Sequence, residues 1–271
     1  MQKKVAFIGA GNMAEAMVKG LITSGLLTKD DVTVSDSSAH RLLHMKQNYE
    51  THAVTENAVA AKGRDIIILA VKPKDMGKVL KEIAPSVTGK QLLVSIAAGV
   101  TIESIEKSLG KKARVVRVMP NTPALVQEGA AAAFAGPNCK PDDIDMAKML
   151  LSAVCKVVVA VGDEKLMDAV TGLSGSGPAY VFLMLEALSD AGVRVGLGRE
   201  ESFTLAAQTM IGAAHMAMHT REPLSKLKDM VTSPGGTTIA GLQKLEEGGV
   251  RAALFAAVEA ATKRSQEIGK S

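Results

Sequence analysis

The sequence predicts an α/β protein in which a doubly wound, mostly parallel β-sheet is followed by an all-helical domain. Three observations lead to this fold class. Short β-branched runs alternate with helical stretches up to about residue 160, and this strand pattern stops after Gly162-Asp163. The rest of the chain is rich in Ala, Leu, Met and Glu, with apolar residues at helical spacing. Because 271 residues suit two domains of ordinary size, we expect domains at residues 1–163 and 164–271.

The predicted strands of the first domain are almost entirely apolar, as expected for a sheet whose two faces are both covered. They are Val5–Ile8, Val32–Ser35, Ile66–Val71, Leu92–Ile96, Val115–Met119, Ala130–Ala135 and Val157–Val161. Amphipathic segments such as Ala14–Ser24 and Met76–Ile83 lie between them. These segments supply the crossover helices that parallel strands require.

The second domain is predicted to contain helices separated by breaks rich in glycine and proline. The expected helices are residues 164–173, 178–196, 199–219, 224–231, 237–247 and 249–268. Several of them are apolar over much of their circumference, so a domain of this size has a thin core unless another chain covers it. The pattern therefore indicates self-association, although the first domain could instead provide the cover.

Composition excludes several classes of function. The 32 basic and 28 acidic residues are interleaved, and the chain has no Trp, five Phe and two Tyr, so no nucleic-acid partner is expected. The apolar runs are too short for a membrane span. Cys139 and Cys155 have neither metal-ligand spacing nor a disulfide pattern, which favours a reducing cytoplasm. The helical pair His215 and His219 has no further ligand beside it, so no metal is expected.

A glycine-rich turn, Gly9-Ala10-Gly11-Asn12-Met13-Ala14, follows the first strand and opens the first helix. Gly9 would turn the chain sharply, Gly11 would leave room for a pyrophosphate, and Ala14 would let the helix pack close to the sheet. Free N–H groups and the helix dipole would hold the negative charge. The turn predicts a Rossmann-type dinucleotide-binding domain, and a purely structural turn is the alternative.

The residues after the second strand leave the choice of coenzyme open. Asp36 could accept hydrogen bonds from a free ribose 2′-hydroxyl, which would favour NAD. Ser37, Ser38 and Arg41 could instead hold a 2′-phosphate, which would favour NADP. We expect Ser35, Asp36 and Ser37 to lie at the coenzyme in either case.

Two further strand ends carry residues suited to a coenzyme. Ala70-Val71-Lys72-Pro73 ends the third strand, and Ile96-Ala97-Ala98-Gly99 ends the fourth. Ligands of open α/β sheets bind outside such carboxyl ends, and the small residues at 97–99 would let a flat ring lie against the backbone. Lys72 is expected to face the coenzyme or solvent rather than to act in catalysis.

Two glycine-rich segments interrupt the helical domain. Ser174-Gly175-Ser176-Gly177-Pro178-Ala179 breaks one helix and starts another. The segment from Thr232 to Ala240 offers hydroxyls, backbone N–H groups and a following helix N-terminus, which together can hold a carboxylate without an arginine. The alternative for both segments is an ordinary helix start.

Taken together, these motifs resemble the pyrroline-5-carboxylate reductases, which catalyse the last step of proline biosynthesis. The similarity runs nearly end to end. It is carried by Phe7–Met13, Ala70–Pro73, Ala97–Ile102, Arg117–Pro123, Ala169–Tyr180, Leu227–Asp229 and Ser233–Thr238. The resemblance implies a reduction of Δ1-pyrroline-5-carboxylate to L-proline, with NADPH usually preferred over NADH. It also implies a Rossmann domain and a helical dimerisation domain that interlocks with its partner, and several members assemble further into decamers.

The same resemblance assigns site residues by matching positions. Coenzyme contacts are implied for Ile8, Gly9, Ala10, Gly11, Asn12, Met13, Asn57, Ala70, Val71, Lys72, Pro73, Ile96, Ala97 and Ala98. The substrate carboxylate would be held by the loop that contains Ser233, Gly235, Gly236, Thr237 and Thr238, and Ser176 is a weaker candidate. Asp36 departs from the family, since an uncharged or basic side chain often helps to hold the 2′-phosphate at this position.

The implied chemistry requires little from side chains. Hydride transfer to a carbon–nitrogen double bond needs a hydrogen-bonded or protonated nitrogen, and the coenzyme supplies the rest. The Thr238 hydroxyl is the expected partner of that nitrogen and the expected catalytic group. A β-hydroxyacid dehydrogenase shares the two-domain plan but carries a lysine on the helix that here reads Pro178–Glu186 without one. A coenzyme-binding regulator without turnover is the third possibility.

Overall fold

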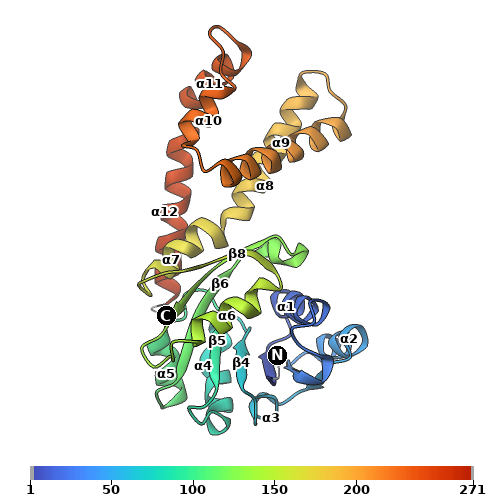
Figure 1. The fold of residues 1–271 in the computed structure, drawn as a ribbon, viewed down its shortest axis with the longest axis vertical. Helices are drawn as coiled ribbons and strands as arrows, with labels where there is room; N and C mark the ends of the chain where they lie inside the picture. Colours follow the sequence, from blue (N-terminus) through green and yellow to red (C-terminus); the bar gives the residue numbers. More distant parts are fainter. Residues whose placement is uncertain (1–2, 270–271) are drawn as a thin grey trace. The chain divides into compact units, whose positions relative to one another are not determined.

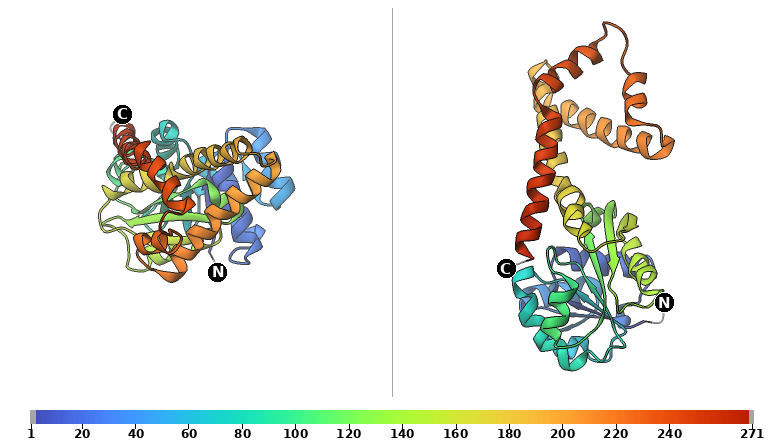
Figure 2. Two further views of the ribbon diagram at one scale, coloured as in Figure 1. Left: turned by 90° about the horizontal axis from the view of Figure 1, so that it is seen from above. Right: turned by 90° about the vertical axis from the view of Figure 1, so that its left-hand side faces the viewer.

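The computed structural model describes residues 3–269, which form two compact units (Figure 1). One unit comprises the chain up to Ser176 together with the residues from Glu259 onwards, and the other is Gly177–Val258. The last helix, α12 (Val250–Ile268), is one continuous helix in Figure 2 and contributes residues to both units.

The first unit is built on an eight-stranded sheet of order β3-β2-β1-β4-β5-β6-β7-β8. All neighbouring strands are parallel except β6 and β7. The strands are β1 (Val5–Ile8), β2 (Val32–Ser35), β3 (His52–Val54), β4 (Ile66–Leu69), β5 (Leu92–Ser95), β6 (Arg114–Pro120), β7 (Gly129–Ala135) and β8 (Cys155–Ala160). The mostly parallel sheet is confirmed. Strand β3 was not predicted, because it is a three-residue edge strand without a buried face.

Helices cover both faces of this sheet, which confirms the doubly wound prediction. One core cluster joins α1 (Asn12–Thr23), α2 (Ala39–Tyr49) and α6 (Asp143–Ser152) to one face. A second cluster joins α3 (Asn57–Ala61), α4 (Pro73–Ile83) and α5 (Ile102–Leu109) to the other. Side chains along β1 alternate between the clusters: Val5 and Phe7 lie in the first, and Ala6 and Ile8 lie in the second.

The register of the sheet brings four strand ends together at one edge. Ile8 is paired with Ser35 on β2 and with Leu69 on β4, and Leu69 is paired with Ser95 on β5. Because these strands are parallel, the residues that follow them meet at the same edge. The fold therefore places the phosphate-binding turn beside the ends of β2 and β4.

The predicted helix at residues 164–173 is shorter than expected. It consists of α7 (Leu166–Val170) and continues as a π-helical turn, η4 (Thr171–Gly175). The Thr171 hydroxyl donates to the carbonyl of Met167 at 2.8 Å. A Cβ on Gly175 would lie 2.5 Å from the Met119 side chain, so the turn packs closely against the end of β6.

The C-terminal part of α12 packs inside the first unit. The hydroxyl of Ser265 is buried and donates to Asp168 Oδ1 at 2.7 Å. A Cβ on Gly99 would lie 3.0 Å from Ile268, so this end of the helix covers the turn after β5. The last helix therefore supports a segment that was predicted to face the coenzyme.

The second unit is entirely helical, as predicted. It contains α8 (Gly177–Arg194), α9 (Arg199–Thr220), α10 (Leu224–Met230), α11 (Thr237–Glu247) and the first part of α12. Helix α11 has the predicted bounds, and the other bounds agree within two residues. No helix within residues 3–269 is long and apolar enough to cross a membrane.

Candidate active site

A cavity of about 490 Å³ lies at the strand ends where β1, β2 and β4 meet. Nine residues predicted to contact a coenzyme line it: Gly9, Gly11, Ser35, Asp36, Ser37, Asn57, Ala70, Val71 and Lys72. The structure thus assembles residues that are up to 63 positions apart in the sequence into one wall. The cavity is where a dinucleotide would bind at the switch between the two halves of the sheet.

The other predicted coenzyme residues lie around this cavity without lining it. Ile8 and Ala10 are fully buried beneath it, Met13 packs against the core, and Asn12 is exposed at the start of α1. Pro73 is the first residue of α4. Ile96, Ala97 and Ala98 follow β5 at the same edge of the sheet.

The predicted substrate residues are divided between the two units. Ser233, Gly235, Gly236, Thr237 and Thr238 belong to the unit formed by residues 177–258. Ser176 belongs to the first unit, where its N–H group donates to the carbonyl of Thr171 at 2.9 Å and ends the π-helical turn. Such π-helical turns occur frequently at functional sites.

The phosphate-binding turn has the geometry that a pyrophosphate requires. Gly9 has a φ of +103°, and a Cβ there would lie 2.6 Å from the carbonyl oxygen of Ala70. A Cβ on Gly11 would meet nothing within 4 Å. Among the described residues no side chain caps the N-terminus of α1, so its first N–H groups are available to an anion. These features of the turn fit a dinucleotide.

The middle residue of the turn is held from both sides by residues that follow β2. The Ala10 N–H group donates to Asp36 Oδ2 at 2.8 Å, and the Ala10 carbonyl accepts from Arg41 Nε at 2.7 Å. The second carboxylate oxygen of Asp36 accepts from the N–H group of Ser38 at 2.8 Å. From the sequence, Asp36 and Arg41 were predicted only as candidate ligands of the ribose or its 2′-phosphate, and their contacts with the turn were not predicted.

Glu15, in the first turn of α1, gathers a group of polar side chains from α2. Its Oε2 accepts from Arg41 Nη2 at 2.6 Å, and its Oε1 lies 2.7 Å from His44 Nε2 and 2.9 Å from the Tyr49 hydroxyl. Burial by itself would raise the pKa of Glu15, but hydrogen bonds from His44, Arg41 and Tyr49 outweigh it and lower the pKa to about 2. The one sequence signal for this cluster is the position of Glu15: an acidic residue lies in the first turn of a helix that was predicted to bind an anion.

The low pKa of Glu15 predicts a loss of stability in acid. A carboxyl whose pKa falls from 4.5 to about 2 on folding stabilises the protein above pH 4.5 by on the order of 3 kcal/mol. About 2 kcal/mol of this should disappear between pH 6 and pH 3, because the unfolded chain binds the proton first. Urea unfolding of wild type and Glu15→Gln at both pH values measures it, since the variant lacks this term. An equal loss in both proteins would contradict the prediction.

Asn57 is oriented from two sides at the wall of the cavity. Its Oδ1 accepts from the Ser35 hydroxyl at 2.7 Å, and its Nδ2 donates to Glu82 Oε2 at 2.7 Å. Lys78 lies 3.9 Å from Glu82 and also lines the cavity. The Asn57 amide is therefore presented to a ligand in one orientation.

The charged residues of the cavity wall are balanced. Lys72, Lys74 and Lys78 face Asp36, Asp75 and Glu82 around the same space. Arg41 does not line the cavity. The positive charges of the cavity wall therefore come from lysines at and after the end of β4.

In the second unit, the loop from Ser233 leads directly into the N-terminus of α11. The Gly236 N–H group donates to the Ser233 carbonyl at 3.0 Å, and Gly235 has a φ of +67°. Gly236 is the N-cap of α11 and brings no side-chain cap, and Thr237 and Thr238 follow as the first helical residues. Within residues 3–269 the Thr238 hydroxyl has no hydrogen-bond partner. The loop thus offers hydroxyls and N–H groups to a small anion.

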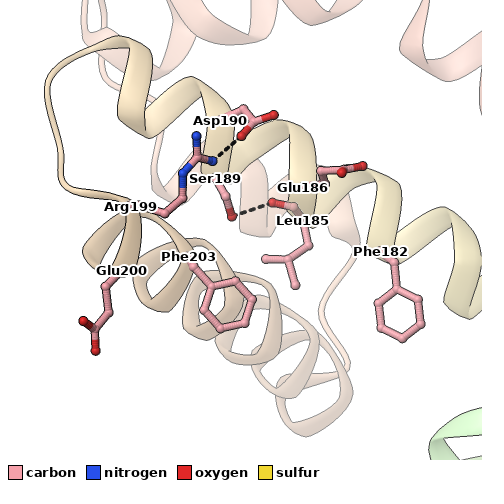
Figure 3. Close-up of a pocket in the computed structure, with 8 residues that line it drawn as sticks. All are labelled: Phe182, Leu185, Glu186, Ser189, Asp190, Arg199, Glu200 and Phe203. Carbon is pink, nitrogen blue, oxygen red and sulfur yellow. Dashed lines mark hydrogen bonds and ion pairs between the residues drawn. The ribbon is translucent and has the colours of Figure 1, made fainter.

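A second cavity, of about 620 Å³, lies between α8 and α9 (Figure 3). Phe182, Leu185 and Phe203 provide its apolar walls, and an ion pair between Asp190 and Arg199 lies at one end. None of the groups on its wall is a nucleophile paired with a base. Its apolar character is that of a packing surface.

Comparison with protein families divides the chain between two family models. Residues 4–99 match the NADP oxidoreductase, coenzyme F420-dependent family, and residues 164–268 match the pyrroline-5-carboxylate reductase dimerisation family. The first match covers the turn and the cavity described above, so the protein is an oxidoreductase that uses a nicotinamide cofactor. The second match covers the helical part of the chain, including the loop before α11.

Relatives match over almost the whole chain. Pyrroline-5-carboxylate reductase of Methanosarcina acetivorans is 46% identical over 268 residues, which cover 99% of this chain and 98% of that protein. The enzyme of Arabidopsis thaliana is 44% identical over 271 residues, which cover 99% of this chain and 96% of that protein.

Solved structures agree with these relatives. A pyrroline-5-carboxylate reductase from Coxiella burnetii has a TM-score of 0.93 and 39% identity, with 100% of both chains covered. Pyrroline carboxylate reductase of Plasmodium falciparum, solved with NADP bound, has a TM-score of 0.89 and 35% identity over 99% of this chain and 98% of that one. Given such similarity in both sequence and fold along its full length, the chain belongs to the pyrroline-5-carboxylate reductase family.

Proposed function

We propose that the protein reduces the C=N bond of Δ1-pyrroline-5-carboxylate to give L-proline, the last step of proline biosynthesis. One observation carries the proposal: the chain combines a dinucleotide-type turn at Gly9–Ala14 with an uncapped, hydroxyl-rich helix start at Ser233–Thr238. The first suits a nicotinamide coenzyme, and the second suits a small carboxylate. Relatives named for this activity match the chain from end to end.

The proposed mechanism assigns simple roles to the residues of the α11 loop. The hydroxyl of Ser233 and the N–H groups of Gly235 and Thr237 bind the substrate carboxylate, and the N–H group of Gly236 keeps its bond to the Ser233 carbonyl and so shapes the loop. The Thr238 hydroxyl donates a hydrogen bond to the ring nitrogen and passes it a proton drawn from water. The bound coenzyme supplies the hydride. The protein contributes position and hydrogen bonding, so no His/Asp or Cys/His pair is needed.

We propose NADPH as the preferred coenzyme, with NADH also accepted. The Ser37 hydroxyl and the ammonium groups of Lys72, Lys74 and Lys78 at the cavity suit a 2′-phosphate. Both carboxylate oxygens of Asp36 already accept backbone N–H groups, so this residue does not need a free 2′-hydroxyl as its hydrogen-bond donor. The Plasmodium falciparum relative was solved with NADP.

We propose that residues 164–271 bind the substrate and form a homodimer. Phe182, Leu183 and Phe255 expose 63%, 67% and 66% of their surface in the single chain, which is unusual for large apolar side chains unless a partner covers them. The dimerisation family matches the same region. Light scattering would give a mass of two chains of 28.2 kDa for a dimer and of ten such chains for a decamer. A monomer at micromolar concentration would contradict self-association.

We place this activity in the cytoplasm. Cys139 and Cys155 are free thiols, as is usual in a reducing compartment. Burial raises the pKa of the Cys155 thiol to about 11, so it stays protonated and unreactive.

Initial rates with Δ1-pyrroline-5-carboxylate test the assignment, with the loss of absorbance of NADPH and NADH followed side by side. We expect turnover with both coenzymes and a larger kcat/KM with NADPH. A control without the imine excludes background oxidation of the coenzyme. A folded protein that binds a coenzyme but turns over neither would overturn the proposed activity, and a binding regulator would then be favoured. A higher kcat/KM with NADH would overturn the coenzyme preference alone.

A further inference from the structure

The pyrophosphate-binding turn is contacted by Arg41, which the sequence offered as a candidate ligand of a 2′-phosphate. Arg41, from α2, donates through Nε to the carbonyl of Ala10 and through Nη2 to Glu15 on α1. We propose that Arg41 is a positioning residue: it holds the turn at Ala10 and neutralises Glu15, and it is not a ligand of the coenzyme's 2′-phosphate. This inference rests on the proposed use of a nicotinamide coenzyme.

The geometry of the guanidinium supports this role. Its two bonds, of 2.7 Å to Ala10 and 2.6 Å to Glu15, use neighbouring N–H groups of one planar fork, so both contacts are made from a single orientation. The side chain of Arg41 is only 25% exposed, and it does not line the cavity that Asp36 and Ser37 line. Arg41 is therefore engaged with the turn and with α1, and it is not part of the cavity wall that Asp36 and Ser37 form.

The ion pair between Arg41 and Glu15 also affects the charge at the N-terminus of α1. Glu15 lies in the first turn of α1, where an unpaired carboxylate would repel a pyrophosphate and oppose the helix dipole that attracts it. The guanidinium of Arg41 cancels this charge, and His44 and Tyr49 also lie within hydrogen-bond distance of the carboxylate. With Glu15 neutralised, the N-terminus of α1 keeps its positive end for the ligand.

The two possible roles of Arg41 predict different effects on the two coenzymes. NADPH and NADH carry the same pyrophosphate, and they differ in the 2′-phosphate. A residue that positions the turn affects both coenzymes by the same factor, whereas a 2′-phosphate ligand affects NADPH alone. The ratio of the two dissociation constants therefore separates the roles.

The test measures the Kd of NADPH and of NADH by calorimetry, with no imine present, on full-length wild type and Arg41→Met. We expect both affinities to fall by a similar factor, about 10-fold, with the ratio of the two Kd values unchanged. In the double variant with Glu15→Gln, part of the loss should be recovered for both coenzymes, because the unpaired carboxylate is gone. A loss confined to NADPH, or no loss with either coenzyme, would overturn the proposal.

Two further variants and one kinetic measurement distinguish positioning of the turn from general damage to the fold. Arg41→Lys keeps the positive charge beside Glu15 but cannot span Ala10 and Glu15 with one fork, so it should bind both coenzymes more weakly than wild type and more tightly than Arg41→Met. Arg64→Met is a matched control, since Arg64 Nε also donates to a backbone carbonyl, that of Ala60 at 3.1 Å, away from the turn. In active wild type and Arg41→Met, KM for the coenzyme should rise while kcat and KM for the imine stay unchanged. A general fall in kcat would count against a role confined to the turn.

The experiment keeps two failures apart. Because coenzyme binding is measured without the imine, the Kd comparison holds whether or not the protein reduces pyrroline-5-carboxylate. If wild type binds both coenzymes and reduces no imine, the proposed activity fails and the role of Arg41 is still tested. If wild type reduces the imine and Arg41→Met loses NADPH selectively, only the inference about Arg41 fails.

Discussion

Alanine in place of Gly9 is expected to weaken coenzyme binding by about 100-fold or more and to destabilise the first unit. The φ of +103° is a conformation that L-residues rarely adopt, and holding one there costs on the order of 1–3 kcal/mol. The new Cβ would also lie 2.6 Å from the carbonyl oxygen and 2.8 Å from the carbonyl carbon of Ala70. Both neighbours are backbone atoms, so relief requires moving the end of β4 and opening the turn.

Gly11→Ala is the matched control for this prediction. Gly11 has a φ of −69°, and its Cβ would meet nothing within 4 Å, so the free energy of unfolding should stay within about 0.5 kcal/mol of wild type. The methyl group would nevertheless occupy the approach to the turn, and coenzyme affinity should fall. Urea unfolding and coenzyme titration measure the two quantities separately. Normal coenzyme binding by the Gly9 variant, or equal destabilisation in both variants, would contradict this account of the turn.

Thr238→Ala is expected to lower kcat by on the order of 10²-fold, because the imine nitrogen would lose its hydrogen-bond donor in the transition state. Loss of the hydroxyl should leave α11 intact: Gly236 is the N-cap, and the Thr238 side chain makes no hydrogen bond within residues 3–269. Coenzyme affinity should also be unchanged, since the cavity is lined by residues of the first unit. Single-turnover rates at saturating imine and coenzyme measure the effect.

Thr238→Ser provides the conservative comparison, since it keeps the hydroxyl and removes only a methyl group. Its kcat should remain within about threefold of wild type. If Thr238→Ala retained full turnover, the hydroxyl would have no part in the reaction. If the serine variant were as slow as the alanine variant, the methyl group and its packing would matter instead of the hydroxyl.

The fold was predictable because its signals are local. Buried strands such as Ile66–Leu69 appear in the sequence as continuous apolar runs, and helices such as α11 appear as apolar positions at helical spacing between glycines. Elements without such a signal were missed or wrongly bounded. Edge strand β3 has no buried residue, and the helix after residue 164 becomes π-helical where Gly175 approaches Met119.

The residues of the candidate site also fall into those with a local sequence signal and those without one. The turn could be recognised from its glycines because sterics at single residues dictate them, and the cavity is lined by Ser35, Asp36 and Asn57, which were predicted to contact a coenzyme. The sequence could not show that Asp36 and Arg41 hold Ala10, because each contact joins residues at least 26 positions apart. Pairing of Ile8 with Ser35 brings them together.

The sequence by itself determined the class of fold, the two-part organisation and the motifs of a coenzyme-dependent reductase, since each depends on hydrophobic periodicity or on the conformation of single glycines. Only the tertiary structure decided which polar groups are already engaged. Glu15, Arg41 and Asp36 have several possible hydrogen-bond partners in the sequence, and burial against the sheet selects one set, because a charge that leaves water must find a partner nearby. In that set Arg41, which the sequence left among several groups able to hold a 2′-phosphate, donates to the carbonyl of Ala10 and to Glu15.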